Sequence, residues 1–363
     1  ENEVRSALGT SVGEFLSLTA TTGSTTSVLK LTGPASGRPI GTVTVLATTV
    51  GNGDLVAVGG GADVTGTGPT FYSNAANWSG ASVPVSSDDI VFDHQASNGC
   101  LYGLDQSAVT PTSVTVSKGY KYALGLPEVN RDNATYPYAE HQETYLKYAA
   151  GTTVKIDGSS AQMIKIDSTT GICTFTVTGS GTTSETNTPP VLLKGSHVSN
   201  SLTVSSGNVG YCFEAVTTGT LTTLFVGGGQ SPAVEIGSGV TTTTISQSSG
   251  TITNLGTATV TTLTQTGGTY NHGGGTITTA NVAGSFVYAG AGTVTTMNVT
   301  SGGTVEATKD PRSRTITNYN MYAGALKDPL GTITFTNGIK LYSKPSDVTL
   351  DLPARKTYTL SAI

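Results

Sequence analysis

A short internal repeat in the C-terminal half is the strongest constraint on how this chain folds. Most copies place a threonine and an aliphatic residue after the first residue and then add further threonines, as in Gly-Thr-Ile-Thr-Thr from Gly275. Copies begin at Gly219, Gly239, Ala258, Gly275, Gly292, Arg314 and Gly331. Successive starts lie 20, 19, 17, 17, 22 and 17 residues apart. This period is too short for a propeller blade and lacks the leucines of a horseshoe repeat, so it predicts a stack of coils.

A second register follows each start after about ten residues. Its copies are Gly250-Thr251-Ile252, Gly268-Thr269-Tyr270, Gly284-Ser285-Phe286, Gly303-Thr304-Val305 and Gly324-Ala325-Leu326. Each unit therefore contains two short predicted strands separated by Gly/Ser turns. Stacked units of this kind form a parallel β-solenoid, also called a parallel β-helix.

The place of the aliphatic residue within each copy predicts where its side chain points. Side chains alternate between the two faces of a strand, so the third residue points into the coil and the flanking threonines point outward. The inward residues are Leu221, Val260, Ile277, Val294, Ile316 and Ile333. Each strand pairs with the next coil, which satisfies its backbone donors and acceptors everywhere except at the two ends of the stack.

The composition agrees with a mainly β fold. Charged residues make up 11% of the 363 residues, against about 25% in an ordinary soluble domain. The 47 glycines supply turns, and the hydrophobic fraction of 36% is too high for a disordered chain. The net charge of −5 argues against a nucleic-acid-binding face, which needs a basic surface. The sequence contains no apolar run of about 18 residues, so no membrane-spanning helix is predicted.

The N-terminal residues 1–70 predict a small α+β module. A helix is predicted because apolar residues recur at helical spacing at Val4, Leu8, Val12 and Phe15-Leu16. Two strands are predicted at Val28–Leu31 and Thr42–Leu46. A glycine-rich stretch at 59–68 follows. The chain starts at Glu1 without an initiator methionine, which predicts a processed or incomplete N-terminus and leaves secretion open.

The β-solenoid is predicted over residues 71–340, less regular in 71–200 and regular in 201–340. Early strands are predicted at Asp89–Phe92, Ser113–Val116, Thr153–Ile156, Met163–Ile166, Thr174–Val177, Val191–Leu193 and Ser201–Val204. An aromatic, proline-containing stretch at about 118–150 is predicted to be a large loop or lateral insertion. Residues 341–363 are predicted to form a C-terminal cap or an oligomerisation arm.

The sequence provides no set of residues that predicts catalysis. Glycan cleavage needs paired carboxylates, or a base with a neutralising cation. Between residues 216 and 305 the chain has one charged side chain, Glu235, and one histidine, His272. No catalytic, cofactor-binding or metal-binding residue is therefore assigned, no cofactor is expected, and the chain is predicted not to be an enzyme.

Three charged clusters outside residues 216–305 are candidate sites. They are Asp88, Asp89, Asp93 and His94; Glu140, His141 and Glu143; and Lys309, Asp310, Arg312 and Arg314. The first two have a spacing compatible with a cation, but turn hydrogen bonds and a solvated loop are the favoured interpretations. The third is predicted to be a solvated turn, with a glycan or subunit contact as the alternative.

The three cysteines, Cys100, Cys173 and Cys212, are far apart in the sequence and odd in number. That count and the absence of a CxxC spacing argue against a disulfide framework and a metal site. Buried apolar thiols are the expected state.

Several short motifs resemble those of known families. The segment Asn77-Trp78-Ser79-Gly80, then Val83-Pro84, then Asp-Asp-Ile-Val-Phe-Asp at 88–93, resembles an opening motif of autotransporter-like bacterial surface proteins. It also resembles that of a family of tailed-bacteriophage structural proteins. Further motifs similar to the phage family are the segment 29–40, Tyr102-Gly103-Leu104, Gly125-Leu126-Pro127 and Tyr145-Leu146-Lys147, so the resemblance covers roughly residues 25 to 200.

The phage resemblance implies a virion-associated part with a small N-terminal module and a β-helical tail: a head decoration, fibre or spike. A strand expected ahead of Glu3 is missing, and no catalytic residues come with the family. The implied partners are further copies of the chain, other capsid or tail proteins and a host-surface glycan. Trimers are common for rods of this type, but the sequence does not fix the oligomeric state, and neither nucleic acid nor membrane is expected. Two alternatives remain: a bacterial extracellular or cell-surface adhesin or filament subunit, and a glycan-active β-helix enzyme.

Overall fold

The computed structural model describes residues 19–22, 29–32, 68–127, 129–130, 138–139, 142–149, 152–158, 163–181, 187–213 and 218–362. The chain divides into two compact units. One comprises residues 1–84, 97–106 and 123–146, and the other, the solenoid unit, comprises 85–96, 107–122 and 147–363.

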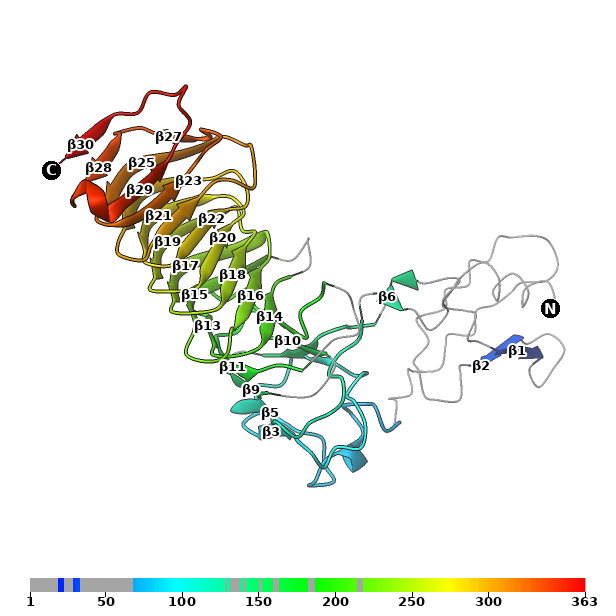
Figure 1. Ribbon diagram of the computed structural model, residues 1–363. Coiled ribbons are helices and arrows are strands. Elements are labelled where there is room, and N and C mark those ends of the chain that lie inside the picture. Colours follow the sequence, from blue (N-terminus) through cyan, green and yellow to red (C-terminus); the bar gives the residue numbers. More distant parts are fainter. Residues whose placement is uncertain are drawn as a thin grey trace, which may run out of the picture. The chain divides into compact units, whose positions relative to one another are not determined.

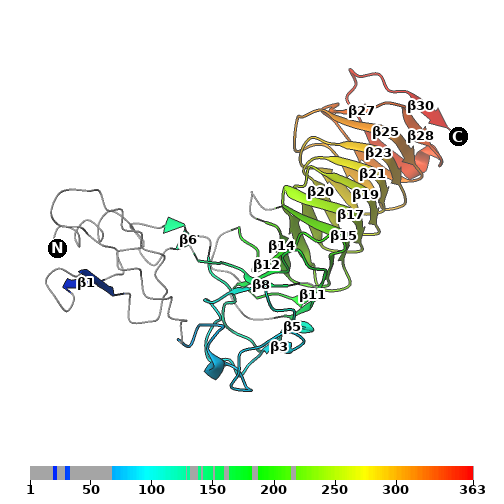
Figure 2. The ribbon, with the colours of Figure 1, turned by 180° about the vertical axis from the view of Figure 1, so that it is seen from behind.

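The solenoid unit is a parallel β-solenoid of about 12 turns, and the predicted fold class is confirmed. Two long parallel sheets run along the stack, and each turn of the chain contributes a strand to both (Figure 1). Figure 2 shows the same stack of rungs from behind. Each rung rests on the one before it through parallel strand pairing, as between β21 and β23.

The first sheet contains the strands of the stronger sequence register. In order, they are β3 (Asp89–Phe92), β5 (Ser113–Val116), β9 (Thr152–Asp157), β11 (Cys173–Gly179), β13 (Ser201–Val204), β15 (Thr218–Val226), β17 (Gly239–Gln247), β19 (Thr259–Gln265), β21 (Thr276–Val282), β23 (Thr293–Val299), β25 (Arg314–Met321), β28 (Ile339–Leu341) and β30 (Leu360–Ala362). Strand β27 (Ile333–Phe335) also pairs with β25.

The second sheet contains the strands of the second register. They are β8 (Leu146–Tyr148), β10 (Ile164–Asp167), β12 (Val191–Lys194), β14 (Asn208–Tyr211), β16 (Ala233–Ile236), β18 (Thr251–Asn254), β20 (Thr269–His272), β22 (Ser285–Tyr288), β24 (Thr304–Glu306), β26 (Gly324–Lys327) and β29 (Val348–Asp351). A single 3-10 turn, η3 (Pro345–Asp347), precedes β29.

The core is a set of aliphatic and aromatic columns, as the repeat predicts. The register places Val260, Ile277, Val294 and Ile316 on successive strands of one column. All six residues predicted to point inward are no more than 2% exposed. One copy differs, because the partner of Leu221 in β17 is the buried Thr242 rather than an aliphatic residue.

Glycines permit the turns between the two sheets. Gly250 has a φ of 73° and Gly324 a φ of 98°, both in the left-handed region that favours glycine. A Cβ atom at Gly250 would collide with the carbonyl oxygen of Pro232, and one at Gly324 with that of Gly303. The glycines that mark the second register therefore let one turn rest directly on the backbone of the turn below.

The other unit has little regular structure in its described part. An aromatic cluster holds the turn around η2 (Ala75–Asn77): the Tyr72 and Trp78 rings make an edge contact with centroids 5.0 Å apart. The short strands β6 (Val129–Asn130) and β7 (Tyr138–Ala139) pair antiparallel. Strand β4 (Asp105–Gln106) lies in this unit as well.

Near the N-terminus, β1 (Thr19–Thr22) and β2 (Leu29–Thr32) pair antiparallel. Strand β2 coincides closely with the predicted strand Val28–Leu31, whereas β1 had no signal in the sequence. The predicted helix from Val4 to Leu16 and the predicted strand Thr42–Leu46 lie outside the described residues.

Candidate functional site

The acidic cluster around β3 forms local turn bonds. The Asp88 carboxylate accepts a hydrogen bond from the backbone N–H of Val85 at 2.8 Å, and Asp93 accepts one from that of Gln95 at 2.9 Å. Asp89 accepts a bond from the Ser113 hydroxyl on the next strand at 2.5 Å. Asp88 and Asp93 thus form turn bonds, as the favoured interpretation predicts, whereas Asp89 bonds across to the next rung.

The second cluster is only partly described. Glu140 and His141 lie outside the described residues, and Glu143 accepts a hydrogen bond from the backbone N–H of Tyr145 at 3.2 Å. Within the described ranges, no group of three or more His, Cys, Asp or Glu side chains is arranged to hold a metal ion.

The third cluster differs from the predicted solvated turn. The exposed Arg312 and the half-buried Asp310 form an ion pair at 2.6 Å, as expected of a turn, but the Arg314 side chain is fully buried and its guanidinium lies 3.5 Å from the same carboxylate. Its guanidinium donates hydrogen bonds to the backbone carbonyls of Gly290 and Arg312 and to the Thr332 hydroxyl. The prediction was wrong for Arg314 because strand β25 begins at that residue and directs its side chain inward.

The interior of the regular rungs contains several polar side chains. Gln247 and Gln265 stack in one column, and the Gln265 amide donates to Gln247, to Gly268 and to Ser285. Asn254 donates to the Tyr270 hydroxyl at 2.9 Å. Backbone carbonyls thus accept two of the three hydrogen bonds that the Gln265 amide donates.

His272 is the one histidine of the regular rungs and is 1% exposed. Its ring packs against the rings of Tyr270, Phe286 and Tyr288, with centroid distances of 6.3, 5.8 and 5.7 Å. Burial lowers its pKa to about 4, and the charge of Arg314 acts in the same direction. The imidazole is therefore neutral at ordinary pH and closed off from solvent, which does not suit a proton-transfer role with an external substrate.

Glu235 lies on β16 with a half-buried side chain, and desolvation raises its pKa. Between residues 218 and 305, Glu235 has no second carboxylate with which to form an acid–base pair. Within this stretch, Glu235 therefore lacks the second carboxyl group that glycoside hydrolysis requires.

All three cysteines are buried, as the sequence predicted, and none forms a disulfide. Desolvation raises the pKa of Cys100 and of Cys173 to about 12. Because the thiolate is the reactive form, neither thiol is set up as a nucleophile at neutral pH.

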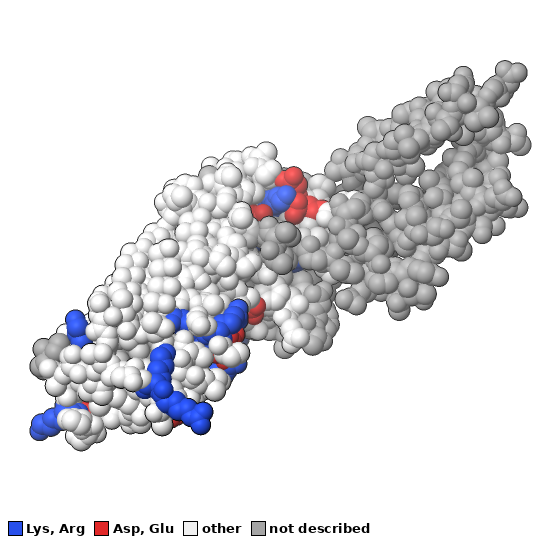
Figure 3. Space-filling model, turned by 90° about the horizontal axis from the view of Figure 1, so that it is seen from above, with Lys and Arg blue, Asp and Glu red and all other residues white. Residues whose placement is uncertain are grey.

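The outer surface of the middle rungs is neutral and hydroxyl-rich. Thr244, Thr262, Thr279 and Thr296 occupy one column on successive strands of the first sheet. Lysine and arginine side chains gather instead at the C-terminal end of the solenoid unit (Figure 3). Exposed members of this group are Lys309, Lys327, Lys344, Arg355 and Lys356.

Two other features of the C-terminal rungs were not predicted from the sequence. The rings of Tyr322 and Tyr342 stack with centroids 4.7 Å apart, and both remain partly exposed. Asp347 lies in η3 beside a groove on the outer face of the second sheet. Residues of three different rungs meet there, so no local motif marks the place.

The described residues therefore define a parallel β-solenoid whose middle rungs carry Glu235 as their one charged side chain and whose C-terminal end is rich in charged residues. Comparison with protein-family models, with curated proteins and with solved structures finds no match for this chain. Among the described residues, none of the helical segments has the length and apolar character that crossing a bilayer requires.

Proposed function

We propose that this chain is a non-enzymatic structural protein of a bacteriophage particle, a head decoration, fibre or spike built on a β-solenoid rod. The observation that carries the proposal is the composition of the rungs between residues 218 and 305, where Glu235 is the only charged side chain. Such rungs offer stacked backbone pairing and a hydroxyl-rich surface but no acid–base pair. A rod of this kind serves to space and display other parts.

The structural roles of the sequence motifs support the same proposal. In the Asn77-Trp78 motif, the Asn77 amide donates to the Phe71 carbonyl and the Trp78 indole N–H to the Tyr72 carbonyl, both at 2.8 Å. The Asp-Ile-Val-Phe segment forms β3, the first strand of the first sheet. The motifs that resemble the phage family thus build turns and the start of the stack rather than a reactive site.

Self-association, for which a trimer is a common arrangement of such rods, and contacts with other capsid or tail proteins are part of this proposal. Support comes from the end of the first sheet, where β30 pairs with β28 and its three residues remain exposed. An edge strand of this kind leaves backbone groups open for pairing. Sedimentation equilibrium of the purified chain measures the assembly, and a monomer at all concentrations would contradict self-association.

The test of the proposed function is mass spectrometry of purified virus particles and, separately, of the cell-envelope fraction from the same culture. We expect peptides of this chain in the particles in amounts stoichiometric with known structural components. Peptides confined to the cell envelope would contradict the proposal and favour the adhesin or filament alternative. Glycan cleavage by the purified chain would favour the enzyme alternative.

A further inference from the structure

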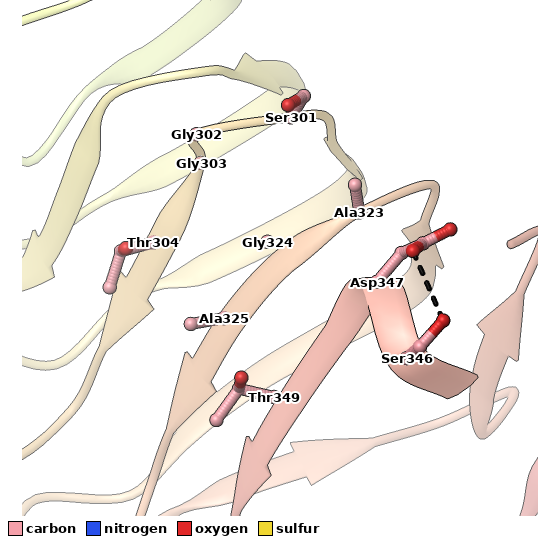
Figure 4. A pocket seen from close by; sticks show the side chains of 10 residues that line it. All are labelled: Ser301, Gly302, Gly303, Thr304, Ala323, Gly324, Ala325, Ser346, Asp347 and Thr349. Atoms are coloured by element: carbon pink, nitrogen blue, oxygen red, sulfur yellow. Dashed lines mark hydrogen bonds between the residues drawn. The ribbon is translucent and has the colours of Figure 1, made fainter. Parts of the chain in front are cut away.

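A groove of about 560 Å³ opens on the outer face of the second sheet near its C-terminal end (Figure 4). It crosses three successive rungs and is lined by residues 301–304 and 323–325 together with Ser346, Asp347 and Thr349. The volume falls within the range of about 300–1,000 Å³ typical of small-molecule sites. The groove is polar and shallow rather than an apolar cavity, so its ligand must be recognised by hydrogen bonds.

The floor of the groove is set by backbone geometry. Thr304, Ala325 and Thr349 occupy one outward column on β24, β26 and β29. Beside them, Gly324 adopts a left-handed conformation and rests on the carbonyl of Gly303, where a Cβ atom would not fit. Small residues therefore keep the floor low, while the two threonines line it with hydroxyl groups that can donate and accept hydrogen bonds.

The wall of the groove carries a positioned carboxylate. Asp347 ends η3, and its two oxygens accept hydrogen bonds from the Ser343 hydroxyl at 2.9 Å and the Ser346 hydroxyl at 3.2 Å. These two bonds orient the carboxylate but leave part of its accepting capacity open, because a carboxylate has about four lone-pair sites. Asp347 is the only charged residue that lines the groove.

An aromatic platform adjoins the groove along the chain. Tyr322 directly precedes Ala323, which lines the groove, and its ring stacks on that of Tyr342 at an interplanar angle of 18°. The two residues remain 44% and 38% exposed. Each ring covers one face of the other, and the exposed remainder of the pair offers an apolar surface that can pack against the C–H face of a sugar ring.

We propose that this groove binds a neutral oligosaccharide. Sugar hydroxyls would donate to the Asp347 carboxylate and exchange hydrogen bonds with Thr304 and Thr349, and a neighbouring sugar ring would pack on the tyrosine platform. A phosphate or an acidic sugar is disfavoured, because no cation lines the groove and Asp347 would repel it. The inference deepens the proposed appendage role and rests on it for the source of the glycan, the host surface.

The first test is binding of the full chain to an array of neutral bacterial-surface and plant oligosaccharides, followed by titration calorimetry with the strongest ligand. We expect a dissociation constant in the micromolar to millimolar range. Loss of the carboxylate in Asp347→Asn and of the platform in Tyr342→Ala should each weaken binding by about tenfold, as expected when one charged hydrogen bond or one aromatic contact is removed.

The most decisive variant places a larger side chain on the floor of the groove. Ala325→Leu projects a larger side chain into the groove and should abolish binding, whereas Thr269→Leu serves as its matched control. Thr269 stands in the same outward column, three rungs away on β20, and the register links the two positions through Ser285 and Thr304. Thermal unfolding of both variants should match the parent chain, which separates loss of the site from loss of the fold.

Two outcomes would overturn the inference: no neutral oligosaccharide binds the parent chain, or binding survives Ala325→Leu. These results are distinct from failure of the proposed function. If the chain is found in particles but binds no glycan, only the proposed binding site is contradicted. If it binds a glycan but is absent from particles, only the proposed virion role is contradicted.

Discussion

The middle rungs, β15 to β23, and the C-terminal rungs, β24 to β30, place polar groups inside the same solenoid in different ways. In the middle, the buried polar side chains include neutral amides such as Gln265, whose donors reach backbone carbonyls of neighbouring turns. At the C-terminal end, the buried polar side chains include charged ones. Arg314 donates to the Gly290 and Arg312 carbonyls, and the buried Asp328 carboxylate accepts from the backbone N–H groups of Thr332 and Ile333.

The difference shows where a solenoid can accept a buried charge. In a rung between two regular neighbours, most backbone groups are already paired between strands, so a buried side chain finds few hydrogen-bonding partners. Those few partners suit a neutral amide. A rung beside a longer connection has free turn carbonyls and N–H groups that can solvate an ion. The spacing of 22 residues before the Arg314 copy provides such a connection.

The largest expected effect comes from a charge placed in the middle rungs. Ile277 is fully buried, so Ile277→Asp should reduce the free energy of unfolding by about 5 kcal/mol or fray the stack, because nothing there solvates a carboxylate. The neighbouring exposed variant Thr278→Asp is the control. Limited proteolysis and chemical denaturation measure both, and an Ile277→Asp chain as resistant as its parent would contradict the coil assignment.

The second expected effect removes a charge from the C-terminal rungs. Arg314→Met keeps most of the side-chain volume but leaves the Gly290 and Arg312 carbonyls without their buried donor. We expect a loss of about 3–4 kcal/mol in the free energy of unfolding. Arg312→Met removes only the exposed member of the pair and should leave the denaturation midpoint nearly unchanged. Equal effects of the two variants would show that burial of Arg314 contributes nothing.

The third expected effect is a pH dependence that originates at His272. Its pKa is about 4 in the folded chain and about 6.5 when unfolded, so the unfolded chain binds more protons between these values. Stability should therefore fall by about 3 kcal/mol as the pH drops from 6.5 to 4, and this contribution should change no further below pH 4.

The variant His272→Asn tests this assignment, since Asn254 already occupies the same column one rung earlier. Denaturation curves at several pH values should show a shallower slope for the variant than for the parent in this window. Parallel slopes would assign the acid sensitivity to other groups.

The smallest expected effect lies on the outer face of the middle rungs. Thr278→Ala removes an exposed hydroxyl and should change the free energy of unfolding by no more than about 0.5 kcal/mol. A larger loss, measured by denaturant titration, would show that the threonine columns stabilise the stack rather than only cover it.

The repeat was sufficient to predict the fold, because glycine and an aliphatic residue recur in two registers that became the two sheets. Ile277 and Val294 could be placed inside from strand parity alone. Arg314 could not, because it takes the place of the glycine that opens most copies, and only the observed start of β25 shows that its side chain points inward.

The groove could not be predicted from the sequence, for a different reason. Thr304, Ala325 and Asp347 are about 20 residues apart along the chain and meet only because successive rungs stack in register. No short motif contains more than one of them. The scarcity of charged residues between 216 and 305, by contrast, could be read directly from the sequence, because it concerns the presence of residue types rather than their placement.

The parallel pairing of rungs has a mechanical consequence. Hydrogen bonds between neighbouring strands point along the stacking direction, so tension applied to the two ends of the solenoid unit passes through every rung interface in series. A rung that detaches from an end releases about 20 residues, or about 70 Å of extended chain. The rod would therefore respond to a strong pull by lengthening in steps, and the remaining rungs would continue to bear the load.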